Sequence, residues 1–521
     1  MPDRAARLLA RGGSRQDKGR AWSGRRGERA VLVLVARIEL IATDQGECST
    51  HARSIWPLSD HSLVRVRIAP SPTGFAHLGT ASTALYNVLF ARANGGTFVL
   101  RVDDTDAERN RPEYELVIYE SLRWLGLEWD EGPDRGGPDA PYRQSERLDL
   151  YKEHAARLLA EGKAYRCYCT PGELDAERKQ AQAEKRPYKY SRRCLVDPPK
   201  ERTEFTVRFK VPGGEIKFAD MIRGEMTFDA GLIGDFILVK SDGFPTYQFA
   251  SPVDDATMKI THVIRGEEHL SNTPYHLMIV DALGYERPLA YAHMPLILAK
   301  DGAKLSKRKH PESNLMLYRE QGYLPEALIN YLALLGWNPG TAEEIFTFDE
   351  LVRVFSFDRV QHAGARFDWD KLNWINGEYI RALADAELSL RLRPFLPNLD
   401  EATILRAVPA LKTRLTKLAD AAVLLEYLWT DPPPPALDPE SVERVRAAAG
   451  VLADLRWEPA PIHDALMGVV EKSGAGPNKT FMPIRLAVTG KKISPPIDYT
   501  LALLPKDVAL SRLQRAAEGH A

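Results

Sequence analysis

The spacing of apolar positions changes between strand-like and helix-like in the part of the chain that begins at Val64. A short apolar run at 64–69 predicts a buried strand, which the turn residues at 70–74 end. Apolar residues at helical spacing follow, and they predict a helix that Gly95 and Gly96 stop. Residues 97–102 predict a second strand and 111–127 a second helix. This order is typical of a parallel α/β sheet.

The pattern is interrupted from about Tyr142. A helix is predicted at 148–161, and short strands are predicted between 205 and 239. Strand and helix spacing return at 260–264 and 273–283, so the sequence predicts a domain inserted into a nucleotide-binding sheet. After Lys309 the pattern is mostly helical. The proline run 432–435 cannot be helical and separates two helical blocks.

Length and composition limit the classes of protein that fit. A chain of 521 residues predicts two to five domains, and 44% hydrophobic with 27% charged residues excludes a disordered chain. The net charge of −1 gives no overall basic signature, so a nucleic-acid surface would have to be a local patch. Four cysteines do not suggest a secreted disulfide scaffold. No apolar run approaches the roughly 20 residues that span a bilayer.

The first sixty residues are basic, with eight arginines between Arg4 and Arg29. An organelle transit peptide, a disordered basic arm and an upstream stretch from a misplaced start codon would all look like this. The acids Asp44, Glu47 and Asp60 favour the last two interpretations. Catalysis is not expected to depend on this segment.

The first candidate phosphate site is the turn at 70–80, which joins the first strand to the first helix. Backbone N–H groups at a helix N-terminus can point at an anion, and Gly74 and Gly79 allow the backbone to approach a ligand closely. His77 can donate hydrogen bonds to phosphate oxygens. Considered alone, the segment is better interpreted as a tight turn with an incidental histidine.

The second candidate is the basic segment 304–308. Lys304 and Lys307 on a loop can neutralise charge that builds on a departing pyrophosphate, and stabilisation present only in the transition state raises the rate. A single pair of lysines three residues apart is more often part of a solvated basic loop.

Both motifs, in this order, resemble the signatures of the class I aminoacyl-tRNA synthetases. His77-Leu-Gly-Thr80 is similar to the HIGH signature and Lys304-Leu-Ser-Lys-Arg308 to the KMSKS signature. The glutamyl-tRNA synthetase family is indicated by further segments: RIAPSPTG, APYRQSERL, KSDGFPTYQFASPVDD, VIRGEEHL, LPEALINYLALLGW and FDWDKLNWINGEYI. The resemblance extends from about Val64 to the C-terminus.

This resemblance implies an α/β Rossmann-like catalytic domain with an inserted α+β acceptor-binding domain, followed by an all-α C-terminal anticodon-binding region. The implied domains are a basic N-terminal extension at 1–62, catalytic halves at 63–140 and 253–312, an insert at 141–252, a helical stem-contact domain at 313–382 and an anticodon-binding domain at 383–521.

The resemblance also implies the reaction. ATP with Mg²⁺ and L-glutamate would give glutamyl adenylate, and the glutamyl group would pass to tRNA(Glu), with tRNA bound before activation. The implied catalytic residues are His77, Lys304 and Lys307. The implied ATP-binding residues are Pro70, Ser71, Gly74, His77, Gly79, Thr80, Glu268, Lys304, Ser306 and Lys307.

Glutamate selection requires cations that match the side-chain carboxylate, and Arg67 and Arg265 occupy the family's two arginine positions. Considered alone, Arg67 is equally an edge-strand surface residue. The implied glutamate-binding residues are Arg67, Ser71, Asp103, Tyr247, Ser251 and Arg265. Two of them depart from the family pattern, which has Glu at the position of Asp103 and often Asn at that of Ser251.

Three cysteines of the insert suggest a zinc site that lacks one ligand. Tyr190 follows Cys169 after 20 intervening residues, and Cys194 comes four positions after Tyr190. The spacing resembles that of the zinc-binding members of the family, which implies the ligand set Cys167, Cys169, Tyr190 and Cys194. Three buried or free thiols are the alternative. Cys48 lies in the N-terminal extension and is not expected to take part.

Arg414 falls where bacterial members read the third anticodon base, and arginine there is associated with accepting the Glu anticodon and rejecting the Gln anticodon. A solvated helix arginine beside Lys412 and Lys417 is as good an interpretation. Alternatives for the whole chain are a non-discriminating enzyme that also charges tRNA(Gln), a glutaminyl-tRNA synthetase, a truncated tRNA-modifying paralogue and an inactive tRNA-binding relative. The family implies a cytoplasmic monomer with no membrane partner.

Overall fold

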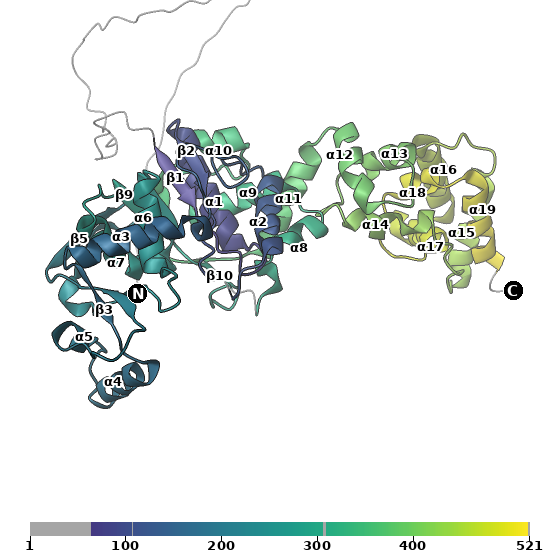
Figure 1. Ribbon diagram of the computed structural model, residues 1–521. Helices are drawn as coiled ribbons and strands as arrows, with labels where there is room; N and C mark the ends of the chain where they lie inside the picture. The colour runs from purple at the N-terminus through teal and green to yellow at the C-terminus, as the bar shows by residue number, and fades with distance from the viewer. Residues whose placement is uncertain (1–63, 107, 306–308, 519–521) are drawn as a thin grey trace, which may run out of the picture. The chain divides into compact units, whose positions relative to one another are not determined.

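The computed structural model of the chain describes residues 64–106, 108–305 and 309–518 (Figure 1). The chain divides into two units, 1–61 and 62–521, and every described residue belongs to the second unit. The predicted N-terminal extension and Cys48 lie outside the described residues, and so do Ser306 and Lys307.

The chain's first described elements form a parallel strand–helix–strand unit: β1 (Arg65–Ile68), α1 (Leu78–Ala93) and β2 (Thr97–Leu100). β1 and β2 pair in parallel, with Arg65 opposite Thr97 and Ile68 opposite Leu100. A Cβ at Gly96 would lie 2.3 Å from the carbonyl oxygen of Val64, so only glycine allows the chain to return this close to β1. The predicted strand, helix and strand are confirmed.

A second sheet contains four strands in the order β6 (Gly224–Asp229), β5 (Glu215–Asp220), β9 (Ala290–Met294) and β8 (His262–Gly266). β8 and β5 each pair with β9 in parallel, whereas β6 pairs with β5 in antiparallel fashion. Helices α6 (Tyr247–Thr257) and α7 (Thr273–Ala282) precede and follow β8 along the chain. Parallel α/β structure therefore returns where the sequence predicts it.

β1 and β8 lie side by side at their beginnings and separate toward their ends. The backbone N–H of Thr261 donates to the carbonyl oxygen of Arg65 at 2.9 Å. Further along, side chains replace the backbone bonds: Nη1 of Arg67 and Nδ2 of Asn87 donate to the carbonyl oxygen of Ile264 at 3.4 and 3.2 Å. Ligands of open α/β sheets usually bind where neighbouring strands diverge in this way.

The inserted region contains α3 (Leu148–Ala160) and a small antiparallel sheet of β3 (Ala164–Cys167), β4 (Thr206–Phe209) and β7 (Ile237–Val239). Two further helices, α4 (Pro171–Ala183) and α5 (Arg193–Val196), lie between β3 and β4 in the sequence. Upstream, α2 (Pro112–Trp124) follows the acidic turn after β2. The insert is therefore mixed α and β, as predicted.

After Lys309 the described chain is mostly helical, as predicted. The short strands β10 (Ile297–Leu298) and β11 (Ala365–Arg366) pair with each other. The helices are α8 (Leu315–Glu320), α9 (Pro325–Gly336), α10 (Phe348–Val354), α11 (Trp369–Ala382), α12 (Asp385–Leu392), α13 (Glu401–Leu411), α14 (Asp420–Leu425), α15 (Pro439–Leu452), α16 (Pro459–Ser473), α17 (Pro477–Thr489), α18 (Ile497–Leu503) and α19 (Lys506–Glu518).

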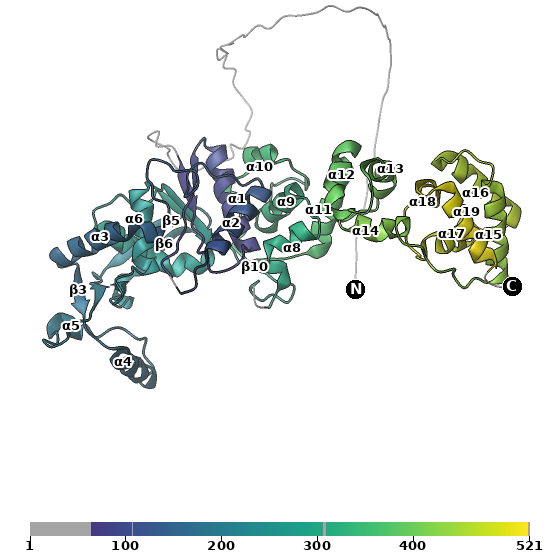
Figure 2. The ribbon, with the colours of Figure 1, turned by 45° about the vertical axis from the view of Figure 1, so that its right-hand side comes forward.

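Helices α15 to α19 pack against one another as one group (Figure 2). The proline run 432–435 lies outside the helices, just before α15, as predicted. No helix among the described residues has both the length and the apolar character that crossing a membrane requires.

Candidate functional site

A cavity of about 380 Å³ opens where β1 and β8 separate, in front of the first turn of α1. Every described residue that the sequence predicts for ATP or glutamate binding lines it: Arg67, Pro70, Ser71, Gly74, His77, Gly79, Thr80, Asp103, Tyr247, Ser251, Arg265, Glu268 and Lys304. Residues up to 237 positions apart in the sequence therefore meet in one pocket, from Arg67 to Lys304.

His77 is the N-cap of α1, and its side chain lines the pocket. Its Nδ1 accepts a hydrogen bond from the backbone N–H of Thr80 at 3.1 Å. Because Nδ1 accepts, the proton of the neutral ring is on Nε2, which lies 3.2 Å from the hydroxyl of Thr80 at the helix N-terminus. A Cβ at Gly79 would lie 3.0 Å from this ring, so glycine makes room for the imidazole. The arrangement suits an anion at the start of α1.

The chain is hydrogen-bonded to residues of the pocket at Leu305, within the basic segment, and again at Leu315, seven residues after that segment. The N–H of Leu305 donates to Ile297 at 3.0 Å, and the N–H of Leu315 donates to Ala76 at 3.2 Å, next to His77. Nζ of Lys304 donates to Oε1 of Glu268 at 3.2 Å. A cation therefore lines the same cavity as the turn at 70–80.

Arg67 is buried, so the interpretation as a surface residue of an edge strand is wrong. Its Nε and Nη2 donate to the two carboxylate oxygens of Asp255 at 3.0 and 3.1 Å. Burial by itself would raise the pKa of Asp255, but the guanidinium groups of Arg67 and Arg101 hold that pKa well below its usual range. Arg67 therefore already has a counter-charge inside the protein.

Arg101 is the centre of the buried polar cluster, and the sequence analysis did not single it out. The side chain is completely buried and donates to Asp103, Asp255 and Ser251. A charged residue inside the apolar run 97–102 was the available signal, because an arginine in a buried strand must be paired. Ser251 and Asp103, the two positions that depart from the family pattern, are thus held by one guanidinium.

Arg265 is buried as deeply as Arg67 but has a different environment. Its donors contact only uncharged groups among the described residues: Nε2 of His293 at 3.2 Å, the Tyr247 hydroxyl at 3.3 Å, Nδ1 of His276 at 3.3 Å, the carbonyl oxygen of His269 at 3.2 Å and the Thr273 hydroxyl at 2.7 Å. Burial, together with the charge of Arg265, lowers the pKa of His269 to about 4 and that of His276 well below its usual value. These rings are therefore neutral near pH 7.

The two arginines of the pocket are therefore not equivalent. Within the described part of the chain, Arg67 has the carboxylate of Asp255, whereas Arg265 has no carboxylate within ion-pair distance. A buried guanidinium without a counter-ion is costly, and an anionic ligand group that reaches it would supply the missing charge. The sequence motifs predict the same role for Arg67 and Arg265 and do not indicate that only Arg67 has a carboxylate partner.

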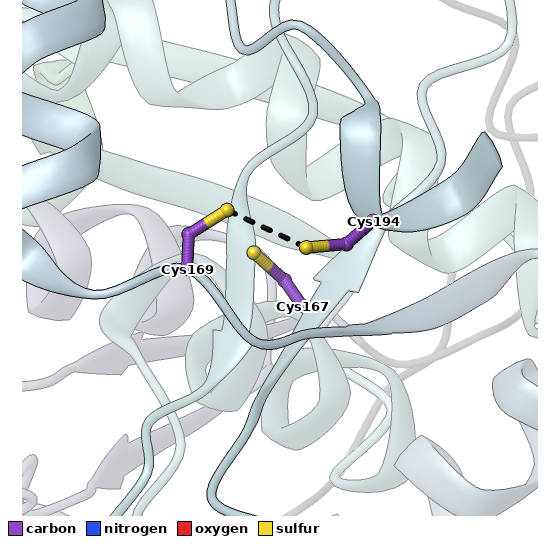
Figure 3. A group of neighbouring side chains, drawn as sticks. All are labelled: Cys167, Cys169 and Cys194. Carbon is purple, nitrogen blue, oxygen red and sulfur yellow. Dashed lines mark hydrogen bonds between the residues drawn. The ribbon is translucent and has the colours of Figure 1, made fainter. Parts of the chain in front are cut away.

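The three cysteines of the insert converge on one point, and their sulfur atoms face one another (Figure 3). Sγ of Cys169 lies 3.4 Å from Sγ of Cys194, too far for a disulfide bond. The Tyr190 hydroxyl lies 3.4 Å from Sγ of Cys167 and 3.2 Å from Sγ of Cys169. Zn–S bonds of 2.3 Å in a tetrahedron put ligand atoms ~3.8 Å apart, so the four side chains fit a zinc ion.

Two arginines lie beside these sulfur atoms. Nε of Arg193 donates to Sγ of Cys169 at 3.1 Å, and the guanidinium of Arg208 stacks 4.2 Å from the centre of the Tyr190 ring. Burial would raise the pKa of Cys167, but hydrogen bonds from Tyr190 and Arg208 bring it down to about 7. Burial raises the pKa of the neighbouring Cys169 to about 11, so a thiolate near neutral pH is favoured at Cys167 and not at Cys169.

Arg414 is exposed and lies in a turn just after α13, so the helical setting predicted for it is wrong. Burial and the positive charge of Arg414 both lower the pKa of Arg485, a residue of α17. Nε of Arg485 donates to the hydroxyl of Ser494 at 2.9 Å, and neither arginine has a carboxylate partner among the residues the structure describes. Two unneutralised cations therefore share one surface of the C-terminal helices.

Comparison with protein-family models finds two matches along the chain. Residues 63–374 match the catalytic domain of the class I tRNA synthetases for Glu and Gln, written "tRNA synthetases class I (E and Q), catalytic domain". Residues 387–517 match an anticodon-binding domain. The first match contains the cavity and the cysteine cluster, and the second contains Arg414 and Arg485.

Curated relatives and solved structures agree with these matches. The chain is 44% identical over 483 residues to a glutamate–tRNA ligase of Acidothermus cellulolyticus, covering 87% of this chain and 95% of that protein. It is 46% identical over 473 residues to a glutamate–tRNA ligase of Carboxydothermus hydrogenoformans, covering 85% of this chain and 97% of that protein. The crystal structure of a glutamate tRNA ligase from Elizabethkingia meningosepticum, solved with its amino acid, superposes with a TM-score of 0.78 at 35% identity, covering 88% and 99%.

Proposed function

The chain belongs to the glutamate–tRNA ligases, a family of class I aminoacyl-tRNA synthetases, and we propose that it charges tRNA(Glu) and rejects tRNA(Gln). L-Glutamate and ATP with Mg²⁺ give glutamyl adenylate and pyrophosphate, and the glutamyl group then passes to the terminal adenosine of the tRNA. The reaction requires positioning of the carboxylate against the α-phosphate and neutralisation of the charge on the leaving pyrophosphate.

In this proposal ATP lies across the first turn of α1. Pro70, Ser71, Gly74, Gly79 and Thr80 line its path, and the backbone N–H groups at the helix start face the phosphates. His77 donates from Nε2. Lys304 leaves Glu268 to meet the pyrophosphate, together with Lys307 and Ser306 of the adjoining segment. The support is that Lys304 lines the same cavity as His77 and that Leu315, seven residues after the basic segment, donates to Ala76 beside His77.

Glutamate binds deeper in the same cavity. The observation that carries this assignment is the buried guanidinium of Arg265 with uncharged partners. The side-chain carboxylate of glutamate replaces the long contact to Tyr247 and supplies the missing charge, and Tyr247 then donates to the same carboxylate. Arg67 contributes through Nη1, since Asp255 occupies its Nε and Nη2.

Glutamine would bring an amide in place of the carboxylate and leave Arg265 without a counter-charge. Breaking a buried ion pair in this way costs about 3–5 kcal/mol. That corresponds to a discrimination of roughly 10² to 10³ or more, at about 1.4 kcal/mol per tenfold. Asp103 and Ser251 complete the subsite, and Asp103 accepts from the substrate's ammonium group directly or through a water molecule.

The helical C-terminal part reads the anticodon. Arg414, with Arg485 beside it, presents unneutralised positive charge where an RNA base or phosphate can accept hydrogen bonds. Cys167, Cys169, Tyr190 and Cys194 hold a structural zinc ion in the insert, which fixes the loop around β3 for the acceptor end of the tRNA. The proposal keeps the domain boundaries predicted from the sequence. It also includes a monomeric state and a cytoplasmic location, where the substrates are.

Charging assays with purified transcripts test the proposal. Wild type, Lys307→Ala and Arg414→Gln are each given tRNA(Glu) or tRNA(Gln), with labelled glutamate or labelled glutamine. We expect wild type to attach glutamate to tRNA(Glu) alone, Lys307→Ala to lose at least about 10²-fold in rate, and Arg414→Gln to lose preference between the two tRNAs.

The other outcomes separate the alternatives. Glutamate on both tRNAs with wild type would replace the proposal by a non-discriminating ligase. Attachment of glutamine would indicate a different amino-acid specificity. Absence of charging by folded wild type would leave an inactive tRNA-binding relative.

A further inference from the structure

Asp220, His293 and Arg265 form a buried chain of hydrogen bonds across three neighbouring strands. Asp220 ends β5, His293 is in β9, and Arg265 is in β8 directly opposite His293. Nδ1 of His293 lies 2.6 Å from Oδ2 of Asp220, and Nε of Arg265 donates to Nε2 of His293 at 3.2 Å. The Asp220 and His293 side chains are completely buried. Neither lines the cavity, so both reach it only through Arg265.

The partners of His293 determine where its proton is. Nε of arginine is only a donor, so Nε2 of His293 must be the acceptor. The proton is therefore on Nδ1 and is donated to Asp220. Burial, opposed by Asp220, lowers the pKa of His293, which keeps the ring neutral. This ring can offer Nε2 as an acceptor in only one of its two tautomers.

Asp220 is itself held so that it can only accept. Its Oδ1 receives the backbone N–H groups of Ile222 and Arg223, both at 3.0 Å, and its Oδ2 is left to face His293. Because the two backbone donors fix Oδ1, the carboxylate keeps Oδ2 toward Nδ1 of His293, where it acts as a hydrogen-bond acceptor. The backbone after β5 thus fixes Asp220, Asp220 fixes the tautomer of His293, and His293 fixes the Nε side of Arg265.

We propose that Asp220 and His293 are positioning residues for the amino-acid specificity of this enzyme, because together they present an acceptor to Nε of Arg265 and so aim its Nη groups into the cavity. The proposal rests on the proposed role of Arg265 in binding the glutamate carboxylate. Arg265 lacks a carboxylate partner in the described structure, so its orientation depends on neutral acceptors such as this ring.

The Asp220→Asn variant tests the tautomer argument with almost no change in shape. The asparagine Oδ1 keeps the two backbone N–H bonds, so its Nδ2 group, a donor, replaces Oδ2 opposite His293. The imidazole must then place its proton on Nε2, where it can be donated only to the hydroxyl of Thr273, 3.1 Å away, and Nε2 no longer accepts from Nε of Arg265. We expect the KM for glutamate to rise about ten- to a hundredfold, while the KM for ATP stays within about twofold.

A rescue variant separates positioning from mere folding. In Asp220→Asn with His293→Gln, the glutamine amide reaches the region of Nε2 and can turn its oxygen toward Arg265, which restores an acceptor. We expect this double variant to reverse most of the rise in the glutamate KM that Asp220→Asn causes. The tautomer is read directly from ¹⁵N-histidine NMR spectra, in which His293 changes from Nδ1–H to Nε2–H in Asp220→Asn.

The matched control is Asp235→Asn, another buried acid, which accepts from Tyr165 and Arg192 and contacts no residue of the cavity. It should leave the glutamate KM unchanged. If Asp220→Asn alters both KM values and kcat together, or the double variant gives no rescue, the pair only supports the fold and the inference is overturned. An unchanged glutamate KM in Asp220→Asn overturns it as well. If Arg265→Gln also leaves that KM unchanged, the proposed role of Arg265 fails instead.

Discussion

Arg101 donates two hydrogen bonds to the carboxylate of Asp103, from Nε to Oδ1 at 2.7 Å and from Nη2 to Oδ2 at 3.3 Å. Both side chains are buried, and Arg101 also donates to Asp255 at 2.7 Å. Burial raises the pKa of Asp103 to about 6, although Arg101 opposes the rise. The carboxylate proposed for the substrate's ammonium group is therefore fixed in position and titrates near neutral pH.

The first prediction concerns pH. Below about pH 6 Asp103 is protonated and neutral, and it no longer attracts the ammonium group, which stays charged throughout this range. We expect kcat/KM for glutamate to fall up to tenfold per pH unit below about pH 6 and to level off above it. Pyrophosphate exchange in the presence of saturating tRNA and ATP measures this. In Asp103→Asn, kcat/KM for glutamate should be lower at all pH values and should no longer fall below about pH 6. If the fall persists in this variant, another group is responsible for the titration.

The second prediction concerns the buried cluster. Arg101→Met removes the cation that faces Asp103 and Asp255, which leaves Asp103 without its ion-pair partner and Asp255 with Arg67 alone. We expect the free energy of unfolding to fall by about 3–5 kcal/mol, measured by urea denaturation. The comparison is Arg92→Met, whose pair with Asp130 is partly exposed and should cost about 1 kcal/mol or less. Equal losses in the two variants would contradict the central role of Arg101.

The third prediction separates catalysis from stability at Lys304. Its pair with Glu268 is half-exposed, so Lys304→Ala should change the free energy of unfolding by no more than about 1 kcal/mol. The rate of adenylate formation should nevertheless fall about 10²- to 10³-fold, because the lysine acts on charge that appears only in the transition state. Lys300→Ala, an exposed lysine of the same segment that does not line the cavity, is the control. Similar rates in the two variants would remove Lys304 from the mechanism.

The fourth prediction concerns zinc. Metal analysis of protein purified without chelators should give about one zinc ion per chain, and Cys194→Ser should lose most of it, because one of four ligands is gone. Cys48→Ser changes the one cysteine outside the cluster and should retain the metal. Zinc that survives in Cys194→Ser, or zinc absent from wild type, would favour three free thiols.

Much of the fold follows from local pattern. The β1–α1–β2 unit is predicted because apolar residues at strand spacing give way to apolar residues at helical spacing, and Gly95 and Gly96 end the helix. The turn that holds His77 is likewise local, since the histidine caps the helix that it begins. Arg414 was placed in a helix because nothing in the local pattern marks the end of α13 at Leu411.

The sequence by itself determined the family, the β1–α1–β2 unit and most of the polar residues that meet in the cavity, because each of these depends on spacing or on short motifs. Tertiary structure alone decided which charges neutralise one another. Arg67 and Arg265 have similar burial and stand at comparable strand positions, yet Asp255 reaches the first and neutral rings surround the second. Asp255 lies 188 residues from Arg67 in the sequence, and the rings around Arg265 lie between 11 and 28 residues from it. The energy of a buried charge depends on distance in space, which spacing along the chain does not encode.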